Sequence, residues 1–339
     1  MTLHHPKHIT LLLISGVLML AAGCGPREST NAPSSGAAPS TSKKSPMDDP
    51  SAVMLLEGKG FKLERAEGGV VAVVATGGEL SDADLEHVAA LPGLRRLVLT
   101  GNSQITNAGL EPIAGLTALK ELKLSSPKID DDGLRHLARL KNLRSLGLDG
   151  THVANLDALR ALDNLQELYL FQTKITDDSL AVVGELRQLR RLRLRGTAVT
   201  DAGLSHLAAA ASLKILDLSE TAVGDAGLAQ LGRMASLEDL NLWLTKITDA
   251  GLPHLAGLSH LKSLNLDNTA IGDDGLQQIA GLTTLEFLHL GKTKTTDAGL
   301  AHLVGLSQLR DLHLTACAVS DEGVEELRAK LPQLKNVVR

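Results

Sequence analysis

The chain has very few aromatic residues: one tryptophan, one tyrosine and three phenylalanines among 339 residues. Because 43% of the residues are hydrophobic, the core of the protein must be aliphatic. The chain also lacks a basic excess, since 34 lysines and arginines face 39 aspartates and glutamates, for a net charge of −5. Without a basic footprint, or rings on which bases could stack, nucleic acid is not an expected partner.

Cysteines and long apolar runs are scarce as well. Two cysteines cannot make a disulfide framework. A single apolar run, residues 9–22, approaches the length needed to span a membrane, which excludes a protein with several transmembrane spans. The apolar content is nevertheless too high for a disordered chain. We therefore expect a folded domain built on aliphatic side chains.

The apolar run at residues 9–22 has the length of a signal-peptide core and ends in Leu-Ala-Ala-Gly-Cys. This ending resembles the lipobox of bacterial lipoproteins, which implies cleavage before Cys24 and a lipid on that cysteine. The alternative is an ordinary secretory signal with an incidental cysteine. The resemblance predicts a signal peptide at residues 1–23 and an exported lipoprotein in the cell envelope, facing the periplasm or in the outer membrane. Gly25 after the cysteine favours the outer membrane, by analogy with enterobacterial sorting.

The segment after Cys24 is rich in proline, serine, alanine and glycine and has no apolar periodicity. Such a composition is typical of a flexible tether. We assign residues 24–51 to the lipidated cysteine and this tether. The membrane contact expected from the sequence is therefore through the lipid anchor only.

A pattern of about 24 residues fills the chain from residue 94 onward. The motif Leu-x-x-Leu-x-Leu begins at residues 94, 119, 143, 165, 189, 213, 237, 261, 285 and 309. Its alternating leucines are typical of a short strand with one buried face. Most copies continue with Thr-Asp-Ala-Gly-Leu-x-x-Leu or a close variant, in which threonine fits a helix N-cap and aspartate suits the first helical turn. One strand and one helix per repeat predict a curved solenoid with a parallel sheet on its concave face and helices on its convex face.

These repeats resemble the leucine-rich repeat family, and their Thr-Asp-x-Gly-Leu helix start is closest to its ribonuclease-inhibitor-like and cysteine-containing-like subclasses. The resemblance implies an α/β leucine-rich-repeat solenoid. We assign residues 52–93 to an N-terminal cap helix and a degenerate first repeat. Residues 94–331 hold ten repeats, and residues 332–339 form a C-terminal capping strand.

Three details of the repeats carry further expectations. The loop after each strand has threonine where this family usually has asparagine, and we expect the hydroxyls to satisfy loop backbone groups. Cys317 occupies the same column, which predicts a small buried filler. Residues 151–156 lack the Thr-Asp-Ala-Gly start, so we expect a shortened helix there.

Nothing in the sequence predicts an enzyme, a cofactor or a metal site. The column of aspartates at the helix starts is explained by the helix dipole. The helical histidines at 136, 206, 254 and 302 come from nonadjacent repeats and are too far apart to share one zinc ion. His289 and His313 fall on adjacent strands, where a weak metal site with Asp267 or Asp311 is the minority interpretation.

The concave face exposes the third, fifth and seventh positions of each Leu-x-x-Leu-x-Leu motif. Four of the five aromatic residues fall there, which chance placement does not explain, and rings beside arginine are typical of binding hot spots. The alternative is that these side chains merely cover the sheet. The candidate binding residues are Tyr169, Phe171, Arg191, Arg193, Arg195, Asp217, Asp239, Asn241, Trp243, Asn265, Phe287 and His289.

The charges of the three arginines must be neutralised either by internal pairing with Asp217 or by a partner's carboxylates. Ten strands give a surface on the order of 50 Å long, which suits a macromolecule better than a metabolite. We predict a monomeric, non-catalytic domain that binds a partner protein on its concave face. The alternative is a binder of carbohydrate or cell-wall polymer that uses Tyr169, Phe171 and Trp243 as stacking platforms.

Overall fold

A computed structural model describes residues 47–66, 68–78 and 80–339. The predicted signal peptide, Cys24 and residues 24–46 of the predicted tether lie outside these residues. In the described part, the strands form one thirteen-stranded sheet in chain order. The strands are β1 (Lys62–Ala66), β2 (Gly69–Val74), β3 (Arg96–Leu99), β4 (Glu121–Leu124), β5 (Ser145–Gly147), β6 (Glu167–Tyr169), β7 (Arg191–Arg193), β8 (Ile215–Asp217), β9 (Asp239–Asn241), β10 (Ser263–Asn265), β11 (Phe287–His289), β12 (Asp311–His313) and β13 (Asn336–Val338).

Helices precede the sheet and connect its strands. The α-helices are α1 (Pro50–Gly58), α2 (Asp82–Ala89), α3 (Asn107–Ile113), α4 (Asp131–Leu137), α5 (Leu180–Glu185), α6 (Asp201–Leu207), α7 (Asp225–Leu231), α8 (Asp273–Ile279), α9 (Asp297–Leu300) and α10 (Asp321–Lys330). Three connections contain 3₁₀ helices: η1 (Asp157–Ala161), η2 (Leu252–Gly257) and η3 (Ala301–Gly305). No helix in the described ranges is both long and apolar enough to cross a bilayer.

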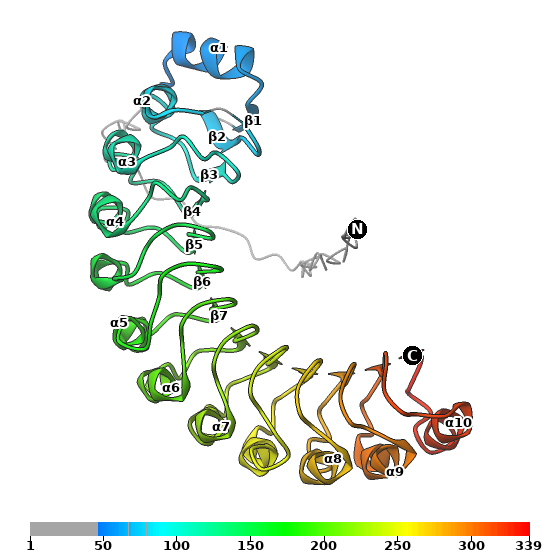
Figure 1. Cartoon of the computed structure of the whole chain (residues 1–339). Coiled ribbons are helices and arrows are strands. Elements are labelled where there is room, and N and C mark those ends of the chain that lie inside the picture. Colours follow the sequence, from blue (N-terminus) through cyan, green and yellow to red (C-terminus); the bar gives the residue numbers. More distant parts are fainter. Residues whose placement is uncertain (1–46, 67, 79) are drawn as a thin grey trace, which may run out of the picture. The chain divides into compact units, whose positions relative to one another are not determined.

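The strands from β2 to β13 are parallel and keep one register, so the leucines of successive repeats face one another. Leu168 pairs with Leu192, and Leu192 with Leu216. The strands line the inner side of an arc and the helices line its outer side (Figure 1). This arrangement confirms the predicted solenoid.

The core is a single aliphatic cluster that runs through all the repeats. Leucines on both sides of each repeat are fully buried, and Phe61 is the one aromatic ring among the buried residues that the structure describes. The chain from Lys44 onward is a compact unit, so the cluster lies entirely within it. Aliphatic burial of this extent is the main favourable term in folding.

The N-terminal end differs from the repeats. Helix α1 begins at Pro50, within the predicted tether, because the Asp49 carboxylate accepts the backbone N–H of Ser51 and caps the helix. Strand β1 pairs antiparallel with β2, a hairpin that the repeat pattern did not predict. Helix α1 and this hairpin cover the first repeat, where a solenoid would otherwise expose its core.

The expected shortened helix in the third repeat is confirmed, since the 3₁₀ helix η1 replaces an α-helix there. The side chain of Asn155 accepts the backbone N–H of Asp157, which sets the start of η1. The repeat pattern did not predict η2 and η3. In η2, Pro253 lacks the N–H that an α-helical bond would need at that position.

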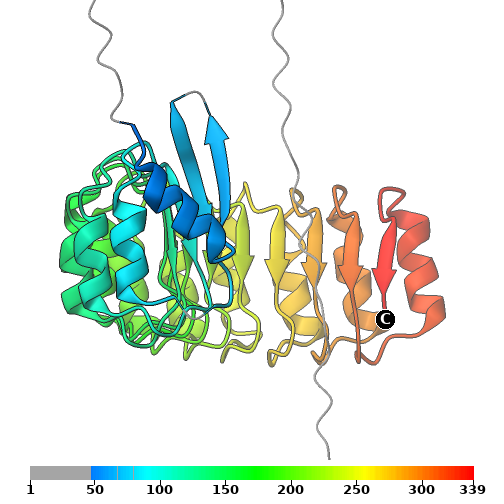
Figure 2. The same cartoon turned by 90° about the horizontal axis from the view of Figure 1, so that it is seen from above.

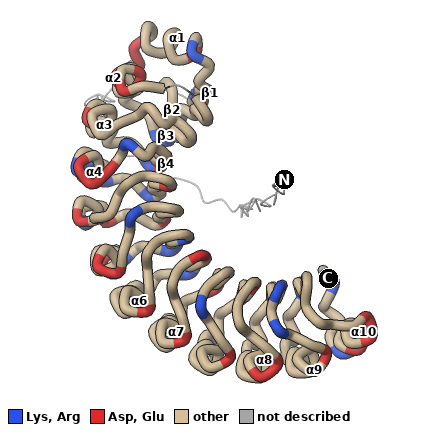
Figure 3. The backbone as a smooth tube through the Cα atoms, in the orientation of Figure 1, with Lys and Arg blue, Asp and Glu red and all other residues tan. Residues whose placement is uncertain are grey.

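The aspartates at the helix starts form hydrogen bonds to the next repeat. These bonds come in addition to the predicted interaction with the helix dipole. In five repeats one carboxylate oxygen accepts the backbone N–H of a threonine or serine in the next repeat at 2.8 Å, and the other accepts its hydroxyl at 2.6 to 2.7 Å. The pairs are Asp82 with Thr106, Asp177 with Thr200, Asp225 with Thr248, Asp273 with Thr296, and Asp297 with Ser320. Figure 3 shows acidic residues recurring in red on the outer helices.

The threonine column behaves as predicted. Each hydroxyl donates to the carbonyl of the leucine three residues earlier, for example from Thr221 to Leu218 at 2.6 Å. Cys317, in contrast, is half-buried, so the expectation of a buried filler is wrong. The Cys317 thiol bonds to the carbonyl of Leu290 in the preceding repeat at 3.0 Å.

Candidate functional site: the concave face

The sheet register brings the candidate side chains together in rows. Tyr169, Arg193, Asp217, Asn241, Asn265 and His289 occupy one row, each paired with the next across β6 to β11. Arg191, Asp239 and Phe287 begin strands β7, β9 and β11, while Phe171, Arg195 and Trp243 follow the ends of β6, β7 and β9. All twelve are half-buried, whereas the leucines between them are fully buried. These side chains therefore lie on the concave face.

Five of these residues form an arginine–aromatic cluster: Tyr169, Phe171, Arg193, Arg195 and Trp243. The Arg195 guanidinium lies 5.0 Å from the ring centre of Phe171 and 4.8 Å from that of Trp243. The Arg193 guanidinium lies 5.4 Å from the Tyr169 ring centre. Cation–π contacts of this kind hold the arginine planes in place.

Arg195 is further fixed by an ion pair with Glu220 at 2.9 Å. Its Nε is buried without a hydrogen-bond partner, although its side chain is 41% exposed. The alternative of internal pairing with Asp217 is wrong, because the Asp217 carboxylate accepts the backbone N–H and the hydroxyl of Ser219 instead. Glu220 can reach Arg195 because it sits in the turn after β8, at a positive φ of 56°.

Tyr169 is bound to its own strand. Its hydroxyl donates to Glu167 at 3.0 Å, and burial together with that carboxylate raises the pKa of Tyr169 to about 12. Glu167 also lies 4.0 Å from Arg191. The ammonium of Lys123 lies 5.5 Å from the Tyr169 ring centre on the side opposite Arg193, and its stem passes over Gly147 on the intervening strand. Cations therefore flank the Tyr169 ring on both sides.

The face beyond β7 carries the opposite charge. Its concave positions on β8 to β12 hold four aspartates and no lysine or arginine: Asp217, Asp239, Asp267 and Asp311. Burial raises the pKa of Asp239, which the hydroxyl of Ser263 and the charge of Arg191 partly offset. The concave face therefore has a cationic strip on and just after β7, made by Arg191, Arg193 and Arg195, next to an acidic half on β8 to β12.

Two histidines come together in the acidic half, as their register predicted. The ring centres of His289 and His313 are 4.9 Å apart, and Phe287 lies 5.1 Å from His313. Burial and the neighbouring His313 lower the pKa of His289, although Asp267 opposes this shift. The described residues include no group of three or more histidine, cysteine, aspartate or glutamate side chains placed to hold a metal ion. His289, His313 and Phe287 therefore form a cluster of three packed rings.

Leu244 belongs to this surface, although its sequence position gave no indication of it. It follows Trp243, is 44% exposed, and adopts a positive φ of 54°. The same left-handed turn is filled elsewhere by Gly196, Glu220 and Asn268, among others. An exposed leucine in this conformation costs backbone energy and hydration, and such strain often marks a functional position.

Replacing Leu244 with glycine is expected to raise the free energy of unfolding by about 1 kcal/mol, because glycine adopts the left-handed turn without strain. The same change should weaken binding at the concave face. Chemical denaturation and a binding assay measure the two effects. Ala316→Gly is the matched control, since Ala316 has a φ of 59° at the far end of the solenoid. It should gain stability and leave binding unchanged, and a loss of stability in Leu244→Gly would contradict the strain argument.

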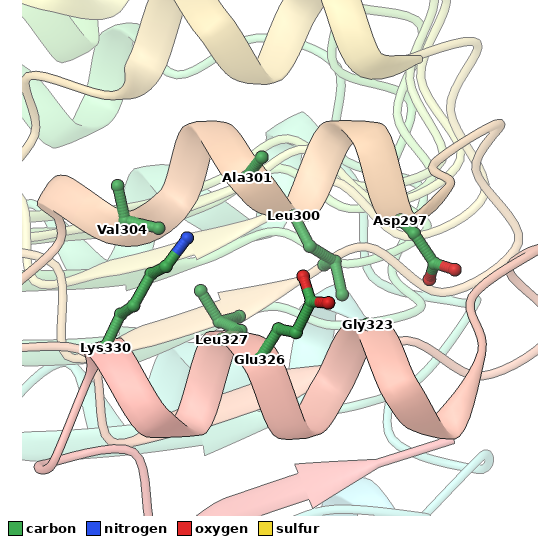
Figure 4. A pocket seen from close by; sticks show the side chains of 8 residues that line it. All are labelled: Asp297, Leu300, Ala301, Val304, Gly323, Glu326, Leu327 and Lys330. Atoms are coloured by element: carbon green, nitrogen blue, oxygen red, sulfur yellow. The ribbon is translucent and has the colours of Figure 1, made fainter.

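One gap on the convex side is too small for a metabolite. Figure 4 shows a gap between α9, η3 and α10, lined among others by Asp297, Val304, Glu326 and Lys330. It holds about 30 Å³, close to the volume of one water molecule. The Asp297 carboxylate at its edge already accepts two hydrogen bonds from Ser320. This gap is a packing feature between two repeats.

Comparison with protein families finds two profiles described as leucine-rich repeat. One matches residues 92–153, and the other matches residues 209–232, 257–280 and 306–327. Comparison with proteins of curated function finds no match.

Among solved structures, an internalin of Listeria monocytogenes is similar with a TM-score of 0.57 and 21% identity, over 84% of this chain and 92% of that one. A leucine-rich repeat protein of Leptospira interrogans matches with a TM-score of 0.44 and 17% identity, over 74% of this chain and 80% of that one. The ectodomain of a receptor kinase from Arabidopsis thaliana matches with a TM-score of 0.49 and 18% identity, over 82% of this chain but only 40% of that one. The internalin shows a shared fold, and identity this low carries no function.

Proposed function

We propose that this leucine-rich-repeat solenoid binds a partner protein through its concave face. One observation carries the proposal: Arg195 is held between the rings of Phe171 and Trp243 while its side chain stays 41% exposed. Partly exposed rings beside an oriented arginine are the composition of interface hot spots. Because stacking fixes the guanidinium in advance, less conformational entropy is lost on binding.

The cationic strip at β7 and the acidic half on β8 to β12 indicate how a partner would be oriented. A partner's carboxylates would meet Arg191, Arg193 and Arg195, and its lysines or arginines would meet Asp239 and Asp267. Complementary charges of this kind mainly set orientation and association rate. The acidic half holds no cation at its concave positions, so a partner aligned the other way would place like charges together.

The cluster geometry favours a protein over a carbohydrate. A sugar needs a free ring face, but Arg193 and Lys123 flank the Tyr169 ring on both sides, and Arg195 covers one face each of Phe171 and Trp243. The rings therefore serve first to hold cations. Binding of cell-wall polymer remains the second candidate function because the three rings are half-exposed.

The proposal extends to location and assembly. We propose an exported lipoprotein held by lipid on Cys24 in the cell envelope, on the outer membrane or facing the periplasm, and acting as a monomer without catalytic activity. The lipobox-like ending at Cys24 and the tether composition that follows it support the location. The extended concave face supports recognition of a macromolecule.

The test is capture of a partner from envelope extract on immobilised residues 44–339. Arg195→Ala should reduce retention about thirtyfold, the effect of a typical hot spot. Arg195→Lys should lose most of it too, because an ammonium lacks the planar stack. His206→Ala on the outer helix α6 is the matched control and should retain the partner fully. Thermal unfolding of each variant confirms that it is folded.

Three results would count against this function. Equal retention by Arg195→Ala and the unmodified protein would place the site elsewhere. Retention on isolated wall polymer that persists at high salt would favour the carbohydrate function, because exposed charge pairs are screened by salt. If no variant captures a protein, the result would favour the alternative that the concave side chains merely cover the sheet.

A further inference from the structure

One row of side chains marks the edge of the solenoid where the strands begin. This strand-entry row comprises the residue after the opening leucine of each repeat: Arg95, Lys120, Arg144, Gln166, Arg190, Lys214, Glu238, Lys262, Glu286, Arg310 and Lys335. From Lys120 onward, the backbone N–H of each member donates to the carbonyl of the preceding member at 2.7 to 2.9 Å. The row is therefore continuous, and its members sit at one level along the strands.

The two halves of the strand-entry row differ in charge balance. In the second half, Glu238 pairs with Lys214 at 2.5 Å and Lys262 at 2.8 Å, and Glu286 pairs with Arg310 at 3.2 Å. The two lysines lower the pKa of Glu238 to about 2. Three of the four cations in this half, Lys214, Lys262 and Arg310, are therefore held in ion pairs by its two glutamates.

The first half has no such compensation. Arg95, Lys120, Arg144 and Arg190 are exposed, and within the described residues none of them takes part in an ion pair. Successive members are about 4.8 Å apart along the sheet, close enough for mutual repulsion. The loops at the same edge add exposed Arg139, Lys141 and Arg187, against the acids Asp163 and Glu185, and Glu185 is paired with Arg160.

We infer that this edge, from Arg95 to Arg190, rests on an anionic lipid surface. Cations held at one level suit a flat layer of negative headgroups, and each lysine or arginine near such a layer strengthens binding. The chain's overall charge of −5 opposes such binding, so a local cationic edge is needed to achieve it.

The entry point of the folded unit supports a membrane as the source of the negative charge. The Asp48 carboxylate accepts the backbone N–H of Val70 at the start of β2, and the Asp49 backbone N–H donates to Ala90 at the end of α2. The strands of the later repeats run downward in Figure 2, so their starts line the upper edge, where helix α1 also begins. The described chain therefore begins at this edge, and the proposed lipid site at Cys24 precedes it in the sequence.

The β1–β2 hairpin is compatible with this placement. The Arg95 backbone N–H donates to Val71, and the hairpin's last pair is Ala66 with Gly69, so its tip extends about two residues beyond the row. Two residues of strand span roughly 7 Å. An extended arginine side chain reaches a similar distance, so the hairpin tip and the row can meet one headgroup layer.

The test uses residues 44–339, which lack Cys24, so any binding is independent of the proposed anchor. Sedimentation with vesicles compares phosphatidylcholine alone with phosphatidylcholine mixed with phosphatidylglycerol. We expect binding to the mixed vesicles only, weakening as salt rises. The triple variant Lys120→Gln, Arg144→Gln, Arg190→Gln should lose about a hundredfold, roughly fivefold for each charge. The control triple Lys214→Gln, Lys262→Gln, Arg310→Gln, whose three cations are all ion-paired, should lose less than about fivefold.

Several results would overturn the inference. These are equal binding to both vesicle types, no binding to either, or an equal loss in the two triple variants. Binding of inorganic polyphosphate in solution with no binding to mixed vesicles would assign the edge to a soluble polyanion. Arg195→Ala should leave vesicle binding intact, and the first triple variant should leave partner capture intact, so this inference and the concave-face function fail separately.

Discussion

Replacing Gly184 with alanine is expected to lower the free energy of unfolding by about 3 kcal/mol, at the upper end of the usual cost of overpacking. Gly184 is buried in α5, and a Cβ built on it would overlap the carbonyl oxygen of His206 in the next repeat. That oxygen belongs to the backbone, so it cannot move aside as a side chain can. The two repeats would have to separate, which would disturb the leucine contacts between them.

Gly281→Ala is the matched control for this prediction. Gly281 lies in the loop after α8, and no atom lies within 4 Å of a Cβ built on it. Alanine there should leave stability unchanged or raise it by up to about 1 kcal/mol, because the unfolded chain loses freedom. Urea denaturation gives both values, and hydrogen exchange locates the change. Similar stability of the two variants would show that the repeats around α5 have more room than the structure gives them.

Replacing Asp225 with alanine is also expected to cost about 3 kcal/mol of unfolding free energy. Its carboxylate accepts the Thr248 backbone N–H at 2.8 Å and the Thr248 hydroxyl at 2.7 Å, and both bonds are partly buried. Hydrogen bonds to a charged group are stronger than neutral ones, and donors left without a partner carry a desolvation cost. Asp225→Asn should cost less, because its amide oxygen can still accept the backbone N–H.

Asp274→Ala provides the comparison, since Asp274 is an exposed aspartate in the first turn of α8 and makes no side-chain hydrogen bond within the described residues. Its loss should change stability by less than about 0.5 kcal/mol. Thermal or urea unfolding of the variants measures the order, which we expect to be Asp274→Ala, then Asp225→Asn, then Asp225→Ala. If Asp225→Ala were as stable as Asp274→Ala, the hydrogen bonds between repeats would contribute little. The aspartates would then act only through the helix dipole.

The repeated leucines made the solenoid predictable, because a strict period leaves one arrangement in which every strand buries the same face. The hairpin of β1 and β2 was not predictable in this way, since residues 62–66 lie outside the repeat and pair antiparallel. The same limit explains the aspartate bonds. The sequence shows that Asp225 and Thr248 both recur, but only the stacked backbone shows that one repeat's carboxylate meets the next repeat's threonine.

The candidate binding residues were predictable as a set, because strand alternation fixes which side chains face inward. Their partners were not. Arg195 pairs with Glu220, and Asp217 is bound to Ser219, because a left-handed turn directs Glu220 back over the face. Leu244 was missed for the same reason, since its turn conformation does not follow from the leucine pattern. These contacts depend on turn geometry and side-chain rotamers. The repeating leucine pattern determines neither of them.

The contacts between repeats use the same partners at each step, which has a consequence for how such a chain can grow. Asp225 meets Thr248 as Asp273 meets Thr296, and Leu216 faces Leu240 as Leu240 faces Leu264. A duplicated 24-residue unit inserted between β8 and β12 would find matching neighbours on both sides. Gene duplication or deletion could therefore lengthen or shorten the concave face by whole units, altering the reach of the domain while each surviving contact keeps its form.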